Sequence, residues 1–426
     1  MRQRSWERVL WAINATLAIA MAVRLVVDWI GGSQLWTTDF TVFRTGWWLA
    51  LHDARRLYDP AAQAVVEDGF IRALGGPTFV GRLLAFLHPP HMALAGCWLE
   101  WVADRWNGKA AFLLWAGCNV ALLARLIVLF RKHARLERGQ TIFIAVALVG
   151  FSPVFLTLGQ GQLSLLLAVA AFDFVWAVAD RQAFVAAGAL LILSFKPPLL
   201  PPLLVVLVAR REWRVLATAA GLGAVVVLGT GAILGPGVWL EYARHVRSLE
   251  RAFAGGLPAG MPTLRGFLAR LAPDAWHGIV DTIAVCAWLA GAAAAGLVAA
   301  VRRGSGVDDP RGDLSLALAV GLFLSPHLYQ HDLVLWVVPV AFVLAAARAD
   351  PPLWRRRLRL LLLWPVWFIL GMVERDLSRR LPIDPLLIPL VMTLVWVGGA
   401  LRPVSAPAGA SAVTRRDERN SSSVRP

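Results

Sequence analysis

Long runs of apolar residues, separated by short polar and basic segments, dominate the chain. The first run extends from Val9 to Ile30, and further runs of spanning or near-spanning length lie at about 80–103, 110–131, 141–158, 162–179, 183–210, 214–235, 278–301, 313–327, 331–348, 358–373 and 385–401. A helix needs about 20 apolar residues to cross the hydrocarbon core of a bilayer. The pattern therefore predicts an all-α, polytopic transmembrane protein with about 11–13 membrane helices.

The run from Ala183 to Arg210 is the least regular of these. Lys196-Pro197-Pro198 and Pro201-Pro202 interrupt it. Proline removes a helix donor, so the run cannot continue as one hydrogen-bonded helix. We expect two short helices that dip through one leaflet.

Composition agrees with a membrane protein. Hydrophobic residues make up 58% of the 426 residues and charged residues only 16%, which is too little polar surface for a soluble domain. The three cysteines, Cys97, Cys118 and Cys286, lie far apart and form no C-x-x-C or Cys/His spacing. We expect them to be packing residues, and the sequence offers no zinc or redox motif.

The net charge of +15 raises the alternative of nucleic-acid binding. The basic residues, however, form short clusters between apolar runs, as they do in cytoplasmic loops of membrane proteins, so we expect no nucleic-acid partner. These clusters are Arg131-Lys132-His133-Ala134-Arg135, Arg210-Arg211, Arg302-Arg303, Arg355 to Arg359 and Arg415-Arg416. With the clusters inside, the loops at 31–80, 159–162, 236–277 and 325–332 fall outside.

Two details of this topology need explanation. Arg2, Arg4 and Arg8 precede the first apolar run as in a signal peptide, but the run is too long and no A-x-A site follows, so we expect a retained span with a cytoplasmic N-terminus. If 80–103 and 110–131 each crossed once, the basic run at 131–138 would lie outside. We therefore expect a re-entrant segment near His88-Pro89-Pro90-His91.

The chain shows no soluble domain. We expect one transmembrane domain over residues 1–402, with long external loops at about 31–80 and 236–277 and surface-lying helices such as Val42 to Leu51 in the first loop. Residues 403–426 are rich in Ser, Ala, Pro and charge, which predicts a disordered cytoplasmic tail.

An acidic residue, Asp39, closely follows the first span in Trp36-Thr37-Thr38-Asp39-Phe40. A carboxylate at the boundary between water and lipid can act as a general base. The alternative is structural, because Asp commonly caps a helix and one is expected to start near Thr41. Spacing alone leaves both roles open.

Lys196 lies inside an apolar stretch, where an unpaired ammonium costs roughly 2.5 to 3.5 kcal/mol. A partner must offset that cost. A lipid-linked phosphate is one candidate, and an internal Asp or snorkelling to the interface is the other.

The turn Ser325-Pro326-His327-Leu328-Tyr329-Gln330-His331-Asp332 carries two histidines, a tyrosine and an acid between two apolar runs. So many polar groups in a short membrane turn indicate a site. A histidine there can bind a phosphate or orient a carboxylate, and a hydrogen-bonded loop histidine is the alternative. No full ligand set for a metal is visible at helical spacing.

Three further segments offer polar groups. Gly159-Gln160-Gly161-Gln162 places two amides at an external helix junction, without the strand-and-helix context of a nucleotide-binding loop. His88-Pro89-Pro90-His91 could be a break that lines a ligand site or only the start of a helix. Arg244, Arg247, Arg251 and Arg265 of the second long loop could engage anionic groups or lipid headgroups.

Taken in chain order, several segments resemble glycosyltransferase family 87, polytopic transferases of the GT-C class that use polyprenyl-phosphate-linked sugars outside the membrane. The resembling segments, within about residues 9–350, are Asp39-Phe40, Leu57-Tyr58-Asp59-Pro60, His88-Pro89-Pro90, Ser152-Pro153 with Gly161-Gln162, Lys196-Pro197 before Arg210 to Arg214, and Ser325-Pro326 with His331. The family usually has Tyr-Pro-Pro where this chain has His88-Pro89-Pro90. Each motif is short, but their order and spacing are fairly specific.

The resemblance implies an inverting, metal-independent glycosyltransferase without a cofactor. It implies a polyprenyl-phosphate sugar as donor, mannose as the transferred sugar by family habit alone, and a glycolipid or glycan acceptor. Asp39 would be the catalytic base. Lys196 and His331 would bind the donor or its phosphate, and we add Arg265 and His91 as donor-binding candidates and Gln160, Gln162, His327 and Tyr329 as substrate-groove candidates. The implied location is the bacterial plasma membrane, with the active site on the external side.

Two departures from the family pattern affect this interpretation. Met261-Pro262-Thr263-Leu264-Arg265 stands where relatives tend to carry an Asn-Gln-Ser-like stretch, and Tyr329-Gln330-His331-Asp332 replaces a more usual Trp-Asp-His-His. They bear on the acceptor pocket and on the role of His331. The competing classes are a lipid or solute transporter or flippase, for which no paired inverted halves are seen, and an O-antigen-ligase-like or polymerase-like enzyme.

Overall fold

The structure is a computed structural model of the 426-residue chain, and it describes residues 2–31, 39–73, 84–253, 261–347 and 387–401. Every regular element in these ranges is a helix, which confirms the all-α class. The longer ones are α1 (Arg2–Gly31), α2 (Asp39–His52), α3 (Pro60–Ala73), α6 (Gly108–Ala134), α7 (Arg138–Val149), α9 (Ser164–Ala179), α10 (Ala183–Leu193), α11 (Leu200–Ala209), α12 (Trp213–Leu234), α13 (Val238–Phe253), α15 (His277–Gly304), α16 (Arg311–Leu324), α17 (Val337–Ala347) and α20 (Leu387–Ala400).

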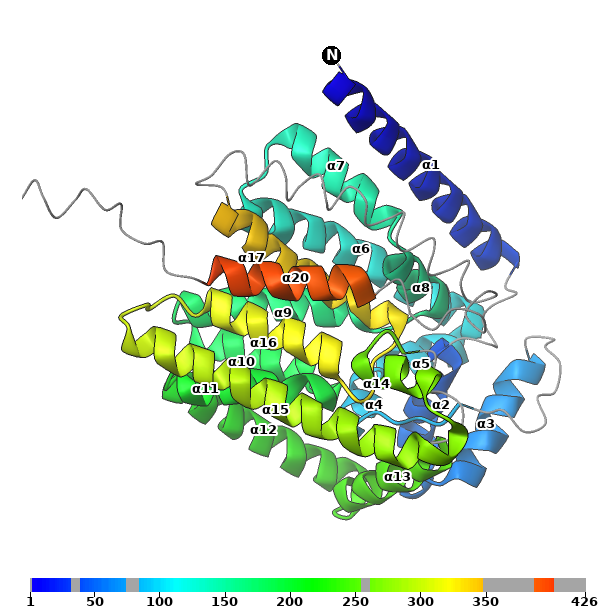
Figure 1. Ribbon diagram of the computed structural model, residues 1–426. Coiled ribbons are helices and arrows are strands. Elements are labelled where there is room, and N and C mark those ends of the chain that lie inside the picture. The colour runs from blue at the N-terminus through cyan, green and yellow to red at the C-terminus, as the bar shows by residue number, and fades with distance from the viewer. Residues whose placement is uncertain (1, 32–38, 74–83, 254–260, 348–386, 402–426) are drawn as a thin grey trace, which may run out of the picture.

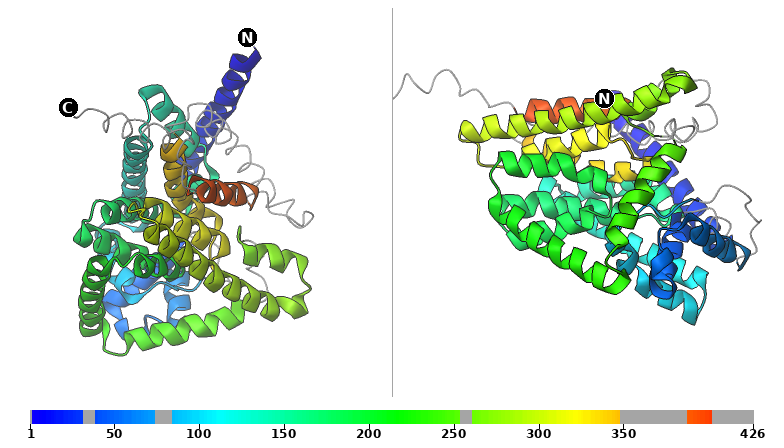
Figure 2. Two further views of the ribbon diagram at one scale, coloured as in Figure 1. Left: turned by 60° about the vertical axis from the view of Figure 1, so that its left-hand side comes forward. Right: turned by 90° about the horizontal axis from the view of Figure 1, so that it is seen from below.

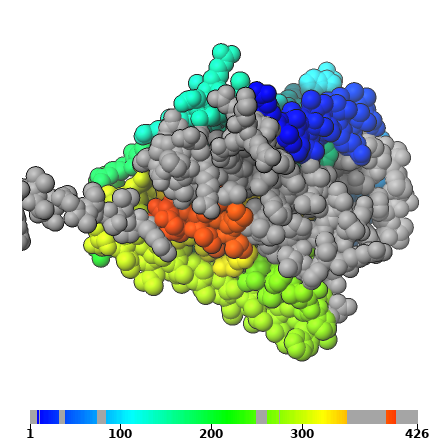
Figure 3. Space-filling model, turned by 45° about the horizontal axis from the view of Figure 1, so that its top comes forward, coloured from blue at the N-terminus to red at the C-terminus, as the bar shows by residue number. Residues whose placement is uncertain are grey.

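Shorter helices lie between them. They are η1 (Ala54–Arg56), α4 (Pro90–Ala95), α5 (Cys97–Arg105), α8 (Ser152–Gln160), η2 (Pro197–Leu199), α14 (Leu264–Leu271), η4 (Asp274–Trp276) and η5 (Gln330–Trp336). The bundle is arranged around α9, which is buried along almost its whole length (Figures 1 and 2). α20 lies on the surface beside α16, and Figure 3 shows it from outside.

Several helices are long and apolar enough to cross a membrane. Among the described residues there are five: Trp11–Gly31, Gly108–Ala134, Trp213–Leu234, His277–Gly304 and Gln330–Ala347. The bent pair α7 and α8 makes a sixth if its two helices form one broken span instead of a re-entrant loop, and four further apolar helices of the described part have 10–17 residues. The chain is thus a multi-pass membrane protein, whereas the count of about 11–13 crossings stays a prediction.

The two interrupted spans have local causes. α7 and α8 meet at an angle of 57° where Gly150, Phe151 and Pro153 break the helix. A Cβ at Gly150 would lie 3.3 Å from the backbone nitrogen of Ala18, so glycine also permits close packing of α1. The prolines after Lys196 divide the run 183–210 into α10, η2 and α11, and the prediction of two short helices is confirmed.

The run at 80–103 is not one continuous helix, in agreement with the expectation that it does not simply cross; a re-entrant course near His88-Pro89-Pro90-His91 stays a prediction. Residues 84–89 are not helical, and α4 and α5 have only six and nine residues. Pro89 and Pro90 set the start of α4, and helices of this length do not reach across a bilayer. Because this segment is no crossing, α1 and α6 can be successive spans, and the basic run at 131–138 then lies at the same end as the N-terminus.

The two ends of the bundle differ in character. α2 to α5, α13 and α14 gather at one end, on the right of Figure 1, and the turns after α6, α9, α11 and α15 lie at the other. The predicted helices of the first long loop exist as α2 and α3. Their position on the membrane surface stays a prediction, as does the division into one domain and a tail.

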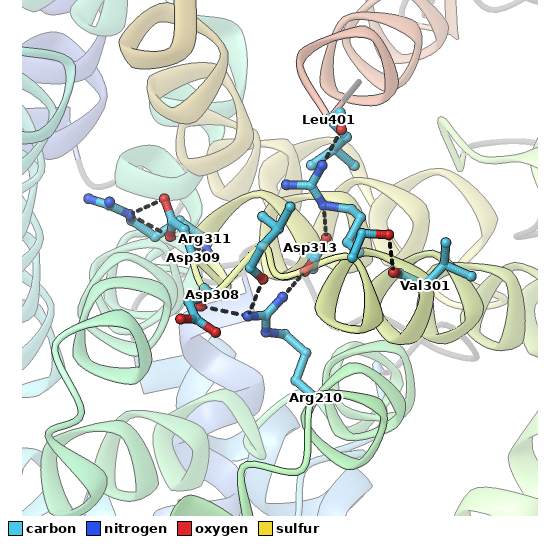
Figure 4. A network of polar contacts seen from close by, with 10 residues as sticks. Arg210, Val301, Asp308, Asp309, Arg311, Asp313 and Leu401 are labelled. Atoms are coloured by element: carbon cyan, nitrogen blue, oxygen red, sulfur yellow. Dashed lines mark hydrogen bonds and ion pairs between the residues drawn. The ribbon is translucent and has the colours of Figure 1, made fainter. Parts of the chain in front are cut away.

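A buried ionic network holds the end with the basic turns together. Arg210 bonds Asp313 Oδ2 at 2.5 Å and the carbonyls of Val307 and Asp308 at 3.0 and 2.6 Å (Figure 4). Arg302 contacts the second oxygen of Asp313 at 2.8 Å and donates to the carbonyl of Leu401. This network joins α11, α15 and α16 to the end of α20.

Some predictions fall outside the described residues. These are the run at 358–373, the basic clusters at 355–359 and 415–416, and the tail 403–426.

Candidate active site

The turn after α8 brings Gln162 to Asp39. Gly161 has φ +66°, and the backbone N–H of Gln162 donates to the carbonyl of Thr157 at 2.9 Å. A Cβ at position 161 would lie 2.8 Å from Cβ of Phe40, so glycine is needed both for the backbone conformation and for the close approach of α2. The buried amide of Gln162 donates from Nε2 to Oδ2 of Asp39.

Asp39 is the first residue of α2 and is partly exposed. The helix begins at Asp39, two residues before Thr41, and its N-terminal dipole favours a carboxylate there. The hydrogen bond from Gln162 fixes the carboxylate without covering it. Asp39 thus has a structural place at a helix N-terminus and a geometry suited to a base, so the two roles are compatible.

Lys196 is paired with an internal acid. Its ammonium bonds Oδ2 of Asp332, and the side chains are 13% and 1% exposed. The backbone N–H of Tyr329 donates to the same oxygen at 2.9 Å, and Ser164 Oγ bonds Oδ1 at 3.2 Å. Of the partners that the sequence allowed, the structure therefore shows the internal Asp.

The polar turn at 325–332 surrounds this ion pair. His331 Nε2 lies 3.5 Å from Asp332 Oδ2, and the rings of His327 and His331 lie 5.2 and 6.0 Å from that of Tyr329. Burial, and next the carboxylate of Asp39, raise the pKa of Tyr329 to about 12. Gln162, which bonds Asp39, is two residues from Ser164, which bonds Asp332, so the two clusters lie close together and form one site.

His88 and His91 brace the break that contains Lys196. His88 Nδ1 lies 3.1 Å from the carbonyl of Phe195, and His91 Nε2 lies 2.9 Å from Ser194 Oγ. The ring of His91 stacks on Trp239 of α13, with centroids 5.6 Å apart. His91 thus contacts the segment beside Lys196, and its role in donor binding stays a prediction.

Arg265 is tied to the polar turn from the second long loop. Its Nε donates to Asp281 Oδ1 at 2.8 Å and a terminal nitrogen to the carbonyl of Pro326 at 2.6 Å. Gln160, at the end of α8, is half-buried. Apart from Gln160, the predicted site residues thus lie on three neighbouring parts of one site: the Asp39 contact, the Lys196 break and the 325–332 turn.

Sequence analysis did not single out four residues that the structure brings to this region. Asp332 appeared there only as part of a polar turn, and Ser164 and Glu67 carried no signal. His88 was noted only in its motif. Glu67 of α3 is 5% exposed, and burial, with a smaller contribution from Asp39, raises its pKa to about 7. Only the position of Glu67, an acid at helical spacing in the first long loop, could have identified it from the sequence.

No group of three or more His, Cys, Asp and Glu side chains suited to a metal ion occurs in the part of the chain that the structure describes. Metal-independent chemistry stays an expectation.

The sequence model of glycosyltransferase family 87 matches residues 86–328, more than half of the chain. The chain belongs to glycosyltransferase family 87. It is therefore a glycosyltransferase, with a sugar donor and an acceptor as substrates. No curated protein and no solved structure matches it.

The matched region of this family 87 transferase contains His91, Gln162, Lys196 and Arg265. Asp39 lies before it, and Tyr329, His331 and Asp332 follow it. The hydrogen bond from Gln162 to Asp39 and the ion pair from Lys196 to Asp332 thus connect the matched region to both flanks.

Proposed function

We propose that this family 87 transferase moves a hexose from a polyprenyl-phosphate-linked donor to a lipid or glycan acceptor, with inversion at the anomeric carbon and without a metal ion. The observation that carries the proposal is that one site holds both a partly exposed carboxylate, Asp39, which Gln162 positions, and a nearly buried cation, Lys196, which Asp332 pairs. Mannose as the hexose rests on the family resemblance. The proposed location is the bacterial plasma membrane, with the site at its external face.

The carboxylate supplies the base. Asp39 accepts the proton of the acceptor hydroxyl as the hydroxyl oxygen forms its bond to the anomeric carbon. The bond from that carbon to the phosphate oxygen breaks, and its electron pair leaves with polyprenyl phosphate. Inversion requires the nucleophile and the leaving group on opposite faces of the sugar, which suits a base and a cation carried by different parts of the site.

The ammonium of Lys196 stabilises the leaving phosphate. Lys196 is most effective there because it lies in a low-dielectric, nearly buried position. Asp332 is its counter-ion without substrate, held by Ser164 and the backbone of Tyr329. His331 lies beside the pair and would contact the same phosphate, while Arg265 and His91 hold the segments around it.

Defined substrates test this proposal. Purified protein is incubated with polyprenyl-phosphate mannose, polyprenyl-phosphate glucose and a nucleotide sugar, each with candidate acceptors, and the products are analysed by mass. We expect hexose transfer from a polyprenyl-phosphate donor and none from the nucleotide sugar. Transfer from the nucleotide sugar alone would contradict the donor class, and lipid or solute flux in sealed vesicles without any transfer would favour the transporter alternative.

A further inference from the structure

Four helix turns at the basic end of the bundle share one geometry. They join α6 to α7, α9 to α10, α11 to α12 and α15 to α16, and each contains a residue with positive φ: Arg135 (52°), Arg181 (58°), Arg211 (58°) and Gly306 (79°). In each turn the next backbone N–H donates to the carbonyl five residues earlier, at distances of 3.0, 2.8, 2.9 and 3.0 Å. This is the Schellman cap, whose left-handed position is usually taken by glycine.

Arginine is an unfavourable choice for that position. A Cβ in the left-handed region approaches the following carbonyl, which costs conformational energy that glycine avoids. Gly306 shows that this chain uses glycine in an equivalent turn. Arg135, Arg181 and Arg211 are the only residues other than glycine with positive φ among those that the structure describes. Their side chains must therefore offset the cost elsewhere.

Contacts within the protein do not supply that offset. All three arginines are exposed, and the side chain of none forms a hydrogen bond or ion pair with another described residue. The contrast with the preceding residue is direct: Arg210 is 3% exposed and bonds Asp313 and two carbonyls (Figure 4). Arg210 holds the turns together, whereas Arg211 is exposed and bonds none of these partners.

The turns lie next to one another. Arg210 bonds the carbonyls of Val307 and Asp308, which sets the turn after α11 against the turn after α15. The ring of His133 at the end of α6 lies 4.1 Å from that of Trp176 near the end of α9. All four turns therefore lie at one end of the bundle, opposite α2, α3 and α13 (Figure 1).

We propose that Arg135, Arg181 and Arg211 form a binding surface for anionic phospholipid headgroups. Helices that cross a membrane end at the level of the headgroups, so exposed turn residues meet lipid phosphate there. A guanidinium can bind phosphate through two parallel hydrogen bonds. Arg131, Lys132 and Arg138 strengthen the positive potential around the first turn.

Replacing the three arginines by glycine distinguishes the effect of their charge on lipid binding from the effect of backbone strain on stability. The full-length R135G/R181G/R211G variant and the wild type are placed in nanodiscs of phosphatidylcholine alone and of phosphatidylcholine with phosphatidylglycerol, and their thermal midpoints are compared. Without anionic lipid, we expect the variant to be at least as stable as the wild type, because glycine relieves the backbone. With phosphatidylglycerol, the midpoint of the wild type should rise by about 2–4 °C and that of the variant should not.

Two further variants and one control with free phosphate identify the ligand. The lysine variant R135K/R181K/R211K, which keeps the charge, should keep most of the rise, and R55Q/R72Q/R105Q, which removes as much charge at the other end, should keep all of it. Inorganic phosphate added to phosphatidylcholine discs should not reproduce the rise. The proposal is overturned if the glycine variant responds to phosphatidylglycerol like the wild type, if it is less stable without anionic lipid, if R55Q/R72Q/R105Q abolishes the rise, or if free phosphate suffices.

Discussion

At the scale of single residues, the hydrogen bond from Gln162 to Asp39 positions the proposed base. A hydrogen bond to a charged group contributes about 1.5–3 kcal/mol. We expect Gln162→Leu to lower kcat by about tenfold or more, with little change in the KM for the donor, because the base is displaced while the donor site is intact. Steady-state kinetics with both substrates measure this.

Gln182→Leu is the matched control, since it removes an exposed amide that lies before α10 and makes no side-chain cap bond. It should leave kcat within about twofold of the wild type. Equal losses in the two variants would mean that Gln162 does not act through Asp39.

The ion pair of Lys196 and Asp332 leads to a stability prediction. Asp332→Ala leaves a nearly buried ammonium without its counter-ion, and breaking a buried pair costs about 3–5 kcal/mol. We expect a large fall in the thermal midpoint in detergent. The double variant Lys196→Met with Asp332→Leu removes both charges and should recover most of that stability while remaining inactive.

The single variant Lys196→Met is the third of these variants, and it leaves the carboxylate of Asp332 without its partner. If the double variant transfers sugar at a rate near that of the wild type, Lys196 has no part in stabilising the leaving phosphate.

The partners of Lys196 and Asp39 are the part of the site that could not be predicted from the sequence. An unpaired Lys196 in an apolar run predicts that some anion is near, and Asp39 predicts either a cap or a base, since both arguments need only local context. The identity of the partners does not follow, because Asp332 is 136 positions from Lys196 and Gln162 is 123 from Asp39. Only the packing of α8, α2 and the turn at 325–332 brings these groups together.

At the scale of elements, Gly161 decides how closely α8 and α2 approach. Gly161→Ala places a methyl group 2.8 Å from Cβ of Phe40 and also strains the left-handed backbone. We expect it to lower both stability and kcat, because α2 carries Asp39 at its first residue. Thermal unfolding and kinetics on the same preparation measure the two effects.

Gly306→Ala is the control for backbone strain alone. Gly306 also has positive φ, but a Cβ there meets nothing within 4 Å. It should cost about 1–2 kcal/mol of stability and leave kcat unchanged. If Gly161→Ala behaves in the same way, the contact between the turn and α2 is not needed for catalysis.

Element boundaries were predictable where proline or glycine acts locally. Pro197 and Pro198 remove helix donors, so the division into α10 and α11 follows from sequence. The run at 80–103 misled because hydropathy alone does not distinguish one long helix from two short ones. The charges at 131–138 supplied the correction, since they required that this segment not cross.

At the scale of the whole molecule, Glu67 makes stability depend on pH. Burial raises its pKa from an ordinary value of 4.5 to about 7, so the folded protein keeps a proton that the unfolded chain releases. The contribution of Glu67 to the free energy of unfolding therefore falls as pH rises from about 4.5 to about 7. Glu67→Gln should flatten the pH dependence of the thermal midpoint in this range.

Asp68→Asn is the neighbouring control, because Asp68 is partly exposed and paired with Arg72. It should leave the slope between these pH values as it is in the wild type. An unchanged slope in Glu67→Gln would place the titrating group elsewhere.

The candidate active site and the basic turns lie at opposite ends of the bundle. One end gathers Asp39, Lys196 and the 325–332 turn, and the other carries the basic turns and the Arg210 network. The class of the molecule followed from composition and apolar runs, because lipid-facing surface requires both. The arrangement of the site did not, since it depends on contacts between helices far apart in the chain.

Comparison of the wild type with Asp39→Asn tests whether Asp39 is the base of a polyprenyl-phosphate-dependent transfer. Asparagine keeps the size of the side chain and can still meet Gln162 after a flip of the amide. With a polyprenyl-phosphate sugar and its acceptor, we expect kcat to fall by about 100-fold or more, with donor affinity and thermal midpoint close to those of the wild type. Turnover at the wild-type rate in Asp39→Asn would contradict it.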